Sequence, residues 1–209
     1  MRDRFWHAPW LLAMVVPIGL AGCAFGTRHP TLVYPPDESP GYMALAHAEP
    51  NAPIAARHVR VVLHGFADER ADKNVVGTVR NGYGVRTADV VPTNSVSDWV
   101  TAAVRSELER SGYRVTRAET ADDSGSYVVS GEILNVFCDM YLEFSGQVVL
   151  VATVRKDGRE LLNKRYEGKG TSGIAVAATA ESYAQSLARA LASAIRPFVA
   201  DVDRALISP

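Results

Sequence analysis

The chain has 209 residues, of which 22 are Lys or Arg and 23 are Asp or Glu, so its formal net charge at pH 7 is −1. This length suits one domain with additions, and the near-zero charge argues against the broad basic surface typical of proteins that bind nucleic acids. Two cysteines are too few for a disulfide-rich secreted scaffold, whereas a hydrophobic content of 47% is enough for a buried core.

The first 22 residues have the features of a bacterial lipoprotein signal peptide. Two arginines lie among the first four residues, and an apolar run follows at 11–20. This run is too short for a helix to span a bilayer, which takes about 20 residues. The sequence Leu-Ala-Gly-Cys at 20–23 resembles a lipobox, in which small side chains admit the signal peptidase and a thiol accepts the lipid. We expect cleavage between Gly22 and Cys23 and lipid attachment at Cys23; the alternative is a short uncleaved anchor with a chance cysteine.

Two further expectations follow from the lipobox. Position 24 is Ala rather than the Asp that often retains enterobacterial lipoproteins in the inner membrane, which implies the outer membrane and its periplasmic face. Because the lipid uses Cys23, Cys138 is the one remaining thiol and an intramolecular disulfide is excluded. Cys138 lies in an apolar stretch, so we expect it to be a small buried core residue.

Residues 24–57 contain six prolines and show no helical or strand period. Because proline fixes φ and removes an amide donor, we expect an extended tether, which as a coil would average about 35 Å in length. The apolar patch at 31–34 is the exception, since it suits an edge strand or docking on the domain. The chain then divides into a signal peptide at 1–22, a lipidated cysteine and Pro-rich tether at 23–57, and a periplasmic domain at 58–209.

The domain begins with a predicted central strand at 59–66, which is rich in β-branched residues and ends in a charged loop at 68–72. Two shorter strand patterns at 75–79 and 83–91 flank Asn81-Gly82, a strong hairpin signal.

A helix follows, with Ser95 and Asp98 as a capping box and Gly112 at the C′ position. Its apolar residues recur with a helical period on one face: Val96, Trp99, Val100, Ala103, Val104 and Leu108.

The second half predicts further strands and a long last helix. Strand patterns occupy 113–117, 127–142, 147–155 and 160–168, with a turn at 122–125 and a tight hairpin at 156–158. The last helix covers about 179–206 and carries one apolar face: Ala184, Leu187, Ala188, Leu191, Ile195, Phe198, Val199 and Val202. Pro197 is expected to kink this helix or divide it in two. The order predicts an α+β fold, a two-layer domain of mostly antiparallel sheet with two packed helices.

Several of these segments resemble the YajG family of bacterial lipoproteins. They are Cys-Ala-Phe at 23–25, Phe-Ala-Asp-Glu-Arg at 66–70, the helix with its glycine at 96–112, and Asn-Lys-x-Tyr at 163–166. The resemblance covers roughly residues 20–205. It implies an outer-membrane lipoprotein that faces the periplasm, with a domain similar to the amino-terminal domain of TolB. It carries over no functional residues, because the shared motifs belong to the fold.

The charged loop at 68–72 is the best candidate for a binding site. Asp68, Arg70 and Asp72 are candidate partner-binding residues, because their charges suit pairing with a partner's side chains. The alternative is a local role, in which Arg70 pairs with a neighbouring acid and orders the chain that leaves the first strand.

No residue pattern indicates catalysis, a metal site or a cofactor. His58 and His64 lie six residues apart on one strand segment, about 20 Å, which is too far to share a metal ion. The glycines at 168, 170 and 173 lack the βαβ context of a nucleotide loop, and we interpret them as a flexible crossover to the last helix. Outside the apolar face of that helix lies a set of residues that we interpret as solvated: Tyr183, Arg189, Arg196 and Arg204.

These observations favour a non-enzymatic, lipid-anchored outer-membrane lipoprotein that acts as a binding or scaffold module of the cell envelope. Its expected partners are the membrane, through the N-terminal lipid, and an envelope protein, but not nucleic acid. The alternative function is an auxiliary carrier of lipid or another hydrophobic ligand in an envelope transport system, which requires an apolar groove between the last helix and the sheet. A hydrolase or wall-binding enzyme is a third hypothesis, and no catalytic constellation supports it.

Overall fold

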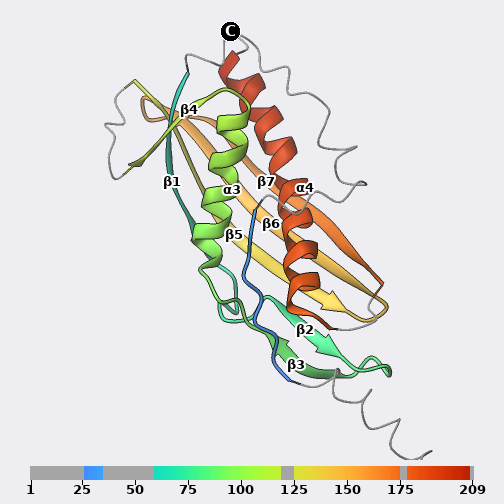
Figure 1. Ribbon diagram of the computed structural model, residues 1–209. Helices are drawn as coiled ribbons and strands as arrows, with labels where there is room; N and C mark the ends of the chain where they lie inside the picture. Colours follow the sequence, from blue (N-terminus) through green and yellow to red (C-terminus); the bar gives the residue numbers. More distant parts are fainter. Residues whose placement is uncertain (1–25, 35–58, 119–124, 175–177, 208–209) are drawn as a thin grey trace, which may run out of the picture.

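A long strand, β5 (Tyr127–Met140), organises the sheet of this protein in a computed structural model that describes residues 26–34, 59–118, 125–174 and 178–207. Along one edge, β5 pairs antiparallel with β6 (Glu143–Lys156), which in turn pairs antiparallel with β7 (Arg159–Ile174). This three-stranded meander supplies most of the paired residues, so the predicted mostly antiparallel sheet is confirmed (Figure 1).

The other edge of β5 is shared by two strands that both run parallel to it. Its first half pairs with β1 (Arg60–Asp68), and its last residues pair with β2 (Gly77–Arg80). Beyond β1 lies the parallel strand β4 (Arg114–Arg117), and beyond β2 lies the antiparallel strand β3 (Arg86–Val90). The first strand is therefore central, as predicted, but it is joined to its neighbours in parallel.

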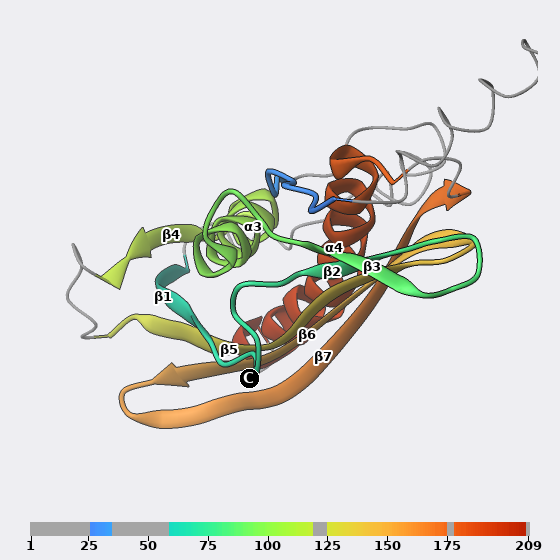
Figure 2. The ribbon, with the colours of Figure 1, turned by 90° about the horizontal axis from the view of Figure 1, so that it is seen from below.

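Both helices lie on one face of the sheet, which curls around them (Figures 1 and 2). Helix α3 (Val96–Arg110) begins at Ser95, whose side chain accepts a hydrogen bond from the backbone N–H of Asp98 at 3.1 Å, and it is followed by Gly112 at φ 93°. Its buried residues are the six that the helical period predicts. The predicted α+β two-layer domain, with two packed helices, is confirmed.

From the sequence, Pro197 is expected to kink the last helix or to divide it in two. Helix α4 (Ala180–Ile207) continues through Pro197, so of these two predicted effects the division is wrong. Proline has no backbone N–H, so the carbonyl of Ser193, one turn earlier, receives no helical hydrogen bond from position 197. Both Ser193 and Pro197 are exposed. The helix faces solvent here, so this carbonyl is accessible to water and the proline is tolerated.

The expectation that Tyr183 is solvated is also wrong, because this residue is fully buried. Its ring packs edge-on against Phe144 with centroids 5.0 Å apart, and its hydroxyl donates to the carbonyl of Thr78 at 3.0 Å. Helix α4 contacts β5, β6 and β7 as well as α3, so more of its circumference is buried than one apolar stripe predicts.

All three glycines predicted to form a flexible crossover, Gly168, Gly170 and Gly173, belong instead to strand β7, and the first two lie against α4. A Cβ atom at Gly168 would lie 2.0 Å from the carbonyl oxygen of Ala190, and one at Gly170 would lie 2.4 Å from the amide nitrogen of Ala190. The correction has a steric reason: these positions must lack a side chain because the backbone of α4 crosses the strand there.

Both predicted hairpins are present. Asp157 and Gly158 have φ values of 49° and 78°, which suit a tight turn between β6 and β7. The turn between β2 and β3 is longer than the Asn-Gly signal suggests, because the positive φ of 80° falls on Gly84 and the side chain of Asn81 accepts from the backbone N–H of Tyr83 and Val85. Of the turn predicted at 122–125, residues 122–124 lie outside the described residues.

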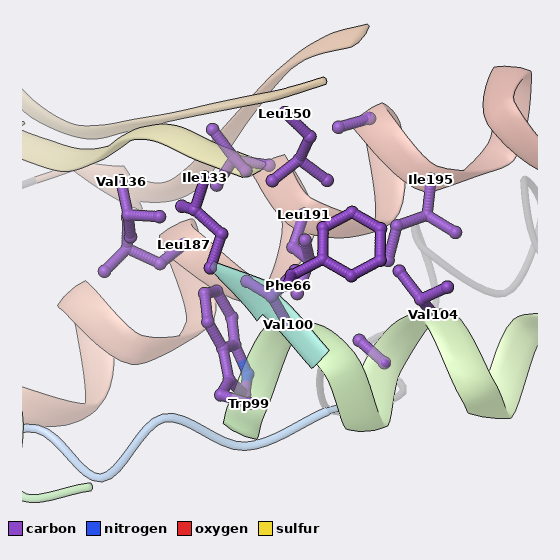
Figure 3. Close-up of a cluster of buried hydrophobic side chains, with 14 of the residues drawn as sticks. Phe66, Trp99, Val100, Val104, Ile133, Val136, Leu150, Leu187, Leu191 and Ile195 are labelled. Atoms are coloured by element: carbon purple, nitrogen blue, oxygen red, sulfur yellow. The ribbon is translucent and has the colours of Figure 1, made fainter. Parts of the chain in front are cut away.

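The core lies between the sheet and the two helices (Figure 3). Side chains from β1, β5, β6, α3 and α4 meet there: Phe66, Trp99, Val100, Val104, Ile133, Val136, Leu150, Leu187, Leu191 and Ile195. The thiol of Cys138 is also fully buried, as the sequence predicts. Burial of this thiol raises its pKa to about 12, so it is protonated and inert at neutral pH.

Candidate functional site

Residues 26–34, which fall within the expected tether, are docked on the domain. Arg28 forms a parallel bridge with Val90, with hydrogen bonds from the Arg28 N–H to the Asp89 carbonyl at 3.0 Å and from the Val91 N–H to the Arg28 carbonyl at 2.8 Å. The segment therefore continues the edge of the sheet beside β3.

The next residues of this segment are fixed by side chains. The amide of Asn94 accepts from the backbone N–H of Leu32 at 2.8 Å and donates to its carbonyl at 3.0 Å, as a backbone partner would. The Leu32 side chain is 3% exposed, and the hydroxyl of Tyr34 donates to the carboxylate of Glu107 on α3. The sequence-based alternative that the apolar patch at 31–34 docks on the domain is confirmed.

This docking shortens the link between the expected lipid and the domain. Gly22 and Cys23 lie outside the described residues, as does the rest of the expected signal peptide, but only residues 24 and 25 separate Cys23 from the docked segment. A stretch of three residues from Cys23 to Gly26 spans at most about 11 Å. A lipid on Cys23 would therefore hold this part of the domain close to the membrane surface.

The candidate partner-binding loop is ordered around Arg70. Its guanidinium donates to both carboxylate oxygens of Asp68 at 2.9 Å, and also to the carbonyls of Lys73 at 2.7 Å and Val75 at 2.9 Å. The carboxylate of Asp72 accepts from the backbone N–H of Asn74 at 2.9 Å.

Arg70 is 5% exposed, so its charge is used inside the loop and the local role corresponds to the observed geometry. Burial alone would raise the pKa of the Asp68 carboxyl, but the hydrogen bonds and the charge of Arg70 outweigh it and hold that pKa below its ordinary value. Of the three candidate residues, Asp72 is the one that is exposed.

The outer face of the meander carries an ordered row of polar side chains. The amide of Asn135 donates to Gln147 at 3.2 Å, and Gln147 donates to the carboxylate of Glu167 at 2.7 Å, so one hydrogen-bonded row crosses β5, β6 and β7. Phe137, directly opposite Gln147 in register, is 36% exposed beside this row. Among the described residues, no element covers this face (Figure 2).

A second ion-pair cluster, which sequence reasoning missed, ties the last turns of α4 to β7. Asp201 is 7% exposed and accepts from Lys164 at 2.8 Å, from the hydroxyl of Tyr166 at 2.9 Å and from Arg204 at 2.8 Å. The hydrogen bond from Lys164, with those from Tyr166 and the charge of Arg204, lowers the pKa of the Asp201 carboxyl in spite of its burial. Its one sequence signal is an acid at a position next to the apolar face of α4.

The groove that a carrier function requires is not formed between the described parts of α4 and the sheet. The backbone of α4 lies against Gly146, Gly168 and Gly170, where a Cβ atom would come within 2.7 Å of it. Ser186 of α4 is fully buried, and its single hydroxyl proton lies between two acceptors on the strands below, the carbonyl of Gly170 at 2.8 Å and that of Phe144 at 3.1 Å. This interface is therefore closed by direct contact.

Other sequence-based candidates remain apart from one another. His64 lies on β1, and His58 lies outside the described residues. Within the ranges that the structure describes, no three His, Cys, Asp or Glu side chains are placed to hold a metal ion. In the same ranges, no helix combines the length and the apolar character needed to cross a membrane.

Comparison with known proteins identifies the family. A family model described as "uncharacterized lipoprotein" matches residues 46–203. The chain belongs to this lipoprotein family. The match confirms the resemblance to the YajG family, whereas no curated protein matches the chain.

Several solved structures are similar to this lipoprotein at low sequence identity. Protein XCC0632 from Xanthomonas campestris, of the family DUF330, is 15% identical, with a TM-score of 0.56 over 85% of this chain and 94% of that one. The hypothetical protein CT253 from Chlamydia trachomatis is 10% identical, with a TM-score of 0.49 over 72% of this chain and 99% of that one. Lipoprotein GNA1162 from Neisseria meningitidis is 13% identical, with a TM-score of 0.36 over 55% and 84%. The first of these similarities establishes a shared fold and nothing about activity.

Proposed function

We propose that this lipoprotein is anchored in the outer membrane by lipid on Cys23, faces the periplasm, and acts without catalysis as a binding or scaffold module of the cell envelope. Membership of a lipoprotein family supports the anchor, and the Leu-Ala-Gly-Cys sequence supplies its attachment point. Ala24, in place of an inner-membrane retention Asp, favours the outer membrane.

The open face of the meander is the observation that carries the binding role. A sheet covered by helices on one side only presents the other side as a rigid surface, and here the row from Asn135 to Glu167 holds polar groups in fixed positions. By contrast, the most buried charged groups, Arg70 and Asp201, serve local structure. Fixed polar groups beside an exposed aromatic side chain are suited to recognition of a protein surface.

The anchoring is tested in cells with the Cys23→Ser variant. We expect the native protein to co-sediment with outer-membrane fractions, and Cys23→Ser to appear in the soluble periplasmic fraction. Globomycin, which inhibits lipoprotein signal peptidase, should cause the unprocessed native form to accumulate. Outer-membrane fractionation of Cys23→Ser would contradict the anchoring proposal.

The binding surface is tested by photo-cross-linking in intact cells. A benzoylphenylalanine is introduced at Phe137 on the outer face, and a matched one at Glu109, which is exposed on α3. We expect a discrete cross-linked species from position 137 that is lost when Glu167→Lys is added, and none from position 109. Equal cross-linking from both positions, or none from either, would contradict the proposed surface.

A further inference from the structure

Exposed apolar side chains gather at one end of the domain and form what we call the end patch: Tyr83, Val85, Tyr141, Leu142 and Ile174. Three of them are mostly exposed to solvent: Tyr83 is 91% exposed, Leu142 73% and Ile174 82%. Large apolar side chains that are grouped and this exposed mark an interaction site more often than ordinary surface.

Three chain segments bring the end patch together. The β2–β3 turn lies on the β5–β6 turn, because a Cβ atom at Gly84 would lie 3.0 Å from the ring of Tyr141. Arg80 fastens the two turns by donating to the Gly84 carbonyl at 2.9 Å and to Asp139 at 2.7 Å. Ile174 ends β7 beside them, paired in register with Glu143. Figures 1 and 2 show the two turns and the end of β7 at the same end of the molecule.

The docked N-terminal segment leads toward this end. Because Arg28 pairs in parallel with Val90, the residues before Arg28 run beside β3 in the direction of the β2–β3 turn. Figure 1 shows the start of this segment next to β3. Arg86, where the turn ends, lies about 13 Å from Val90 along the strand, and the five residues from Cys23 to Arg28 reach about 17 Å. Cys23 can therefore lie level with the end patch.

The charges around the end patch favour apolar contact over electrostatic attraction. Arg80 is paired with Asp139, and Arg86 is paired with Asp89, so the two arginines that flank the turn are neutralised by neighbours. Two of the five side chains are tyrosines, whose rings suit the headgroup region of a bilayer. An acyl anchor on Cys23 would also hold the patch close to the bilayer, which raises the effective concentration of lipid around it. A small apolar area is then enough for membrane contact.

We propose that the end patch inserts into the lipid surface in which Cys23 is anchored, so that the domain stands on the membrane at this end. This inference rests on the proposed lipid anchor. The first strand and the β6–β7 turn, at the other end of the meander, then point away from the bilayer, and the outer face of the sheet stays open to a partner.

The test uses the lipidated full-length protein in vesicles of phosphatidylethanolamine and phosphatidylglycerol, with and without brominated acyl chains. Leu142→Trp reports on the end patch. Leu161→Trp is the matched control, because Leu161 is also partly exposed but lies near the opposite end of β7. Apart from these reporters, the processed chain has one tryptophan, Trp99, which is buried and common to both variants. We expect brominated lipid to quench the Leu142→Trp emission and to leave the Leu161→Trp emission unchanged.

The remaining outcomes separate the inference from the anchor on which it rests. Flotation of the protein with the vesicles, without quenching at position 142, would overturn the inference and leave the anchor intact. Failure to float would overturn both. Quenching at both positions would overturn the upright orientation. A blue-shifted Leu142→Trp emission without vesicles, together with a concentration-dependent increase in size, would assign the patch to contact between copies of this chain.

Discussion

Gly168 of β7 lies directly beneath Ala190 of α4, with room for a hydrogen atom and none for a methyl group. A Cβ atom at Gly168 would also lie 2.4 Å from the amide nitrogen of Ala194, so the obstacle is helix backbone that cannot rotate away. This contact sets the distance between α4 and the sheet.

We therefore expect Gly168→Ala to lower the free energy of unfolding by about 3 kcal/mol, because the helix must move off the strand. Gly65→Ala is the control, since nothing lies within 4 Å of a Cβ atom at Gly65. That change should alter stability by less than about 1 kcal/mol. Urea titration of the two variants measures both values, and equal effects would show that α4 adapts freely to the added group.

Loss of the Arg70 side chain should destabilise the loop after β1. In Arg70→Met the Asp68 carboxylate stays partly buried without its cation, so we expect a loss of about 3 kcal/mol at pH 7. Arg86→Met is the control, because its ion pair with Asp89 is exposed and should contribute less than about 1 kcal/mol.

The Arg70→Met effect should also depend on pH in a defined direction. In the native protein the pKa of Asp68 lies below its unfolded value, so the pair stabilises the fold above that unfolded pKa and is lost as pH falls through the folded pKa. The difference between native protein and variant should therefore be largest near neutrality and shrink below about pH 4. A difference that stays constant from pH 7 to pH 3 would contradict the role assigned to the Asp68 charge.

The contrast between α3 and α4 shows what the sequence could predict and what it could not. Every buried residue of α3 was predictable, because this helix buries a single face at a regular period. The burial of Tyr183 was not, since it depends on the curl of the sheet around α4. Similarly, the sequence around Gly168 and Gly170 does not show whether these glycines form a flexible linker or lie in a strand that the backbone of a helix crosses closely.

For the strands and the candidate site too, local patterns were predictable from the sequence, whereas contacts between distant segments were not. Local patterns located most strands. The parallel pairing of β1 with β5 was not predictable, because it joins segments about 60 residues apart and no sequence pattern in either strand indicates its partner. From the sequence, Arg70 suits either a partner's side chain or a local pair with a neighbouring acid. Only the folded loop places the carbonyls of Lys73 and Val75 around its guanidinium.

Asn94→Ala should release the N-terminal segment while the domain stays folded. The variant loses two hydrogen bonds to Leu32, worth about 1 kcal/mol each, so the undocked population should rise about 30-fold. The rate of proteolytic cleavage within 26–34, followed by mass spectrometry, measures this change. Thr31→Ala is the control, because the hydroxyl of Thr31 bonds to Thr93 at an exposed position. Unchanged cleavage in Asn94→Ala would show that other contacts hold the segment.

The Cys138 thiol should be unreactive in the folded protein. In a Cys23→Ser chain it is the only thiol, and both its full burial and its pKa of about 12 suppress the thiolate at pH 8. We expect no labelling by iodoacetamide under native conditions and complete labelling in urea, measured by intact mass. Rapid native labelling would mean that β5 opens frequently beside β2.

The shared edge of β5 also imposes an order on folding. Strand β1 comes early in the chain, but its two partners, β4 and β5, come later, and β5 begins about 60 residues after β1 ends. A chain that emerges amino terminus first therefore carries an apolar strand with both hydrogen-bonding edges open until β4 has followed, and with one edge open until β5 has followed. Non-local pairing of this kind slows folding and prolongs exposure to aggregation. Strand β1 is consequently the segment of this fold that stays exposed to aggregation longest, and its hydrogen-bonding edges are completed only when β5 has paired with it.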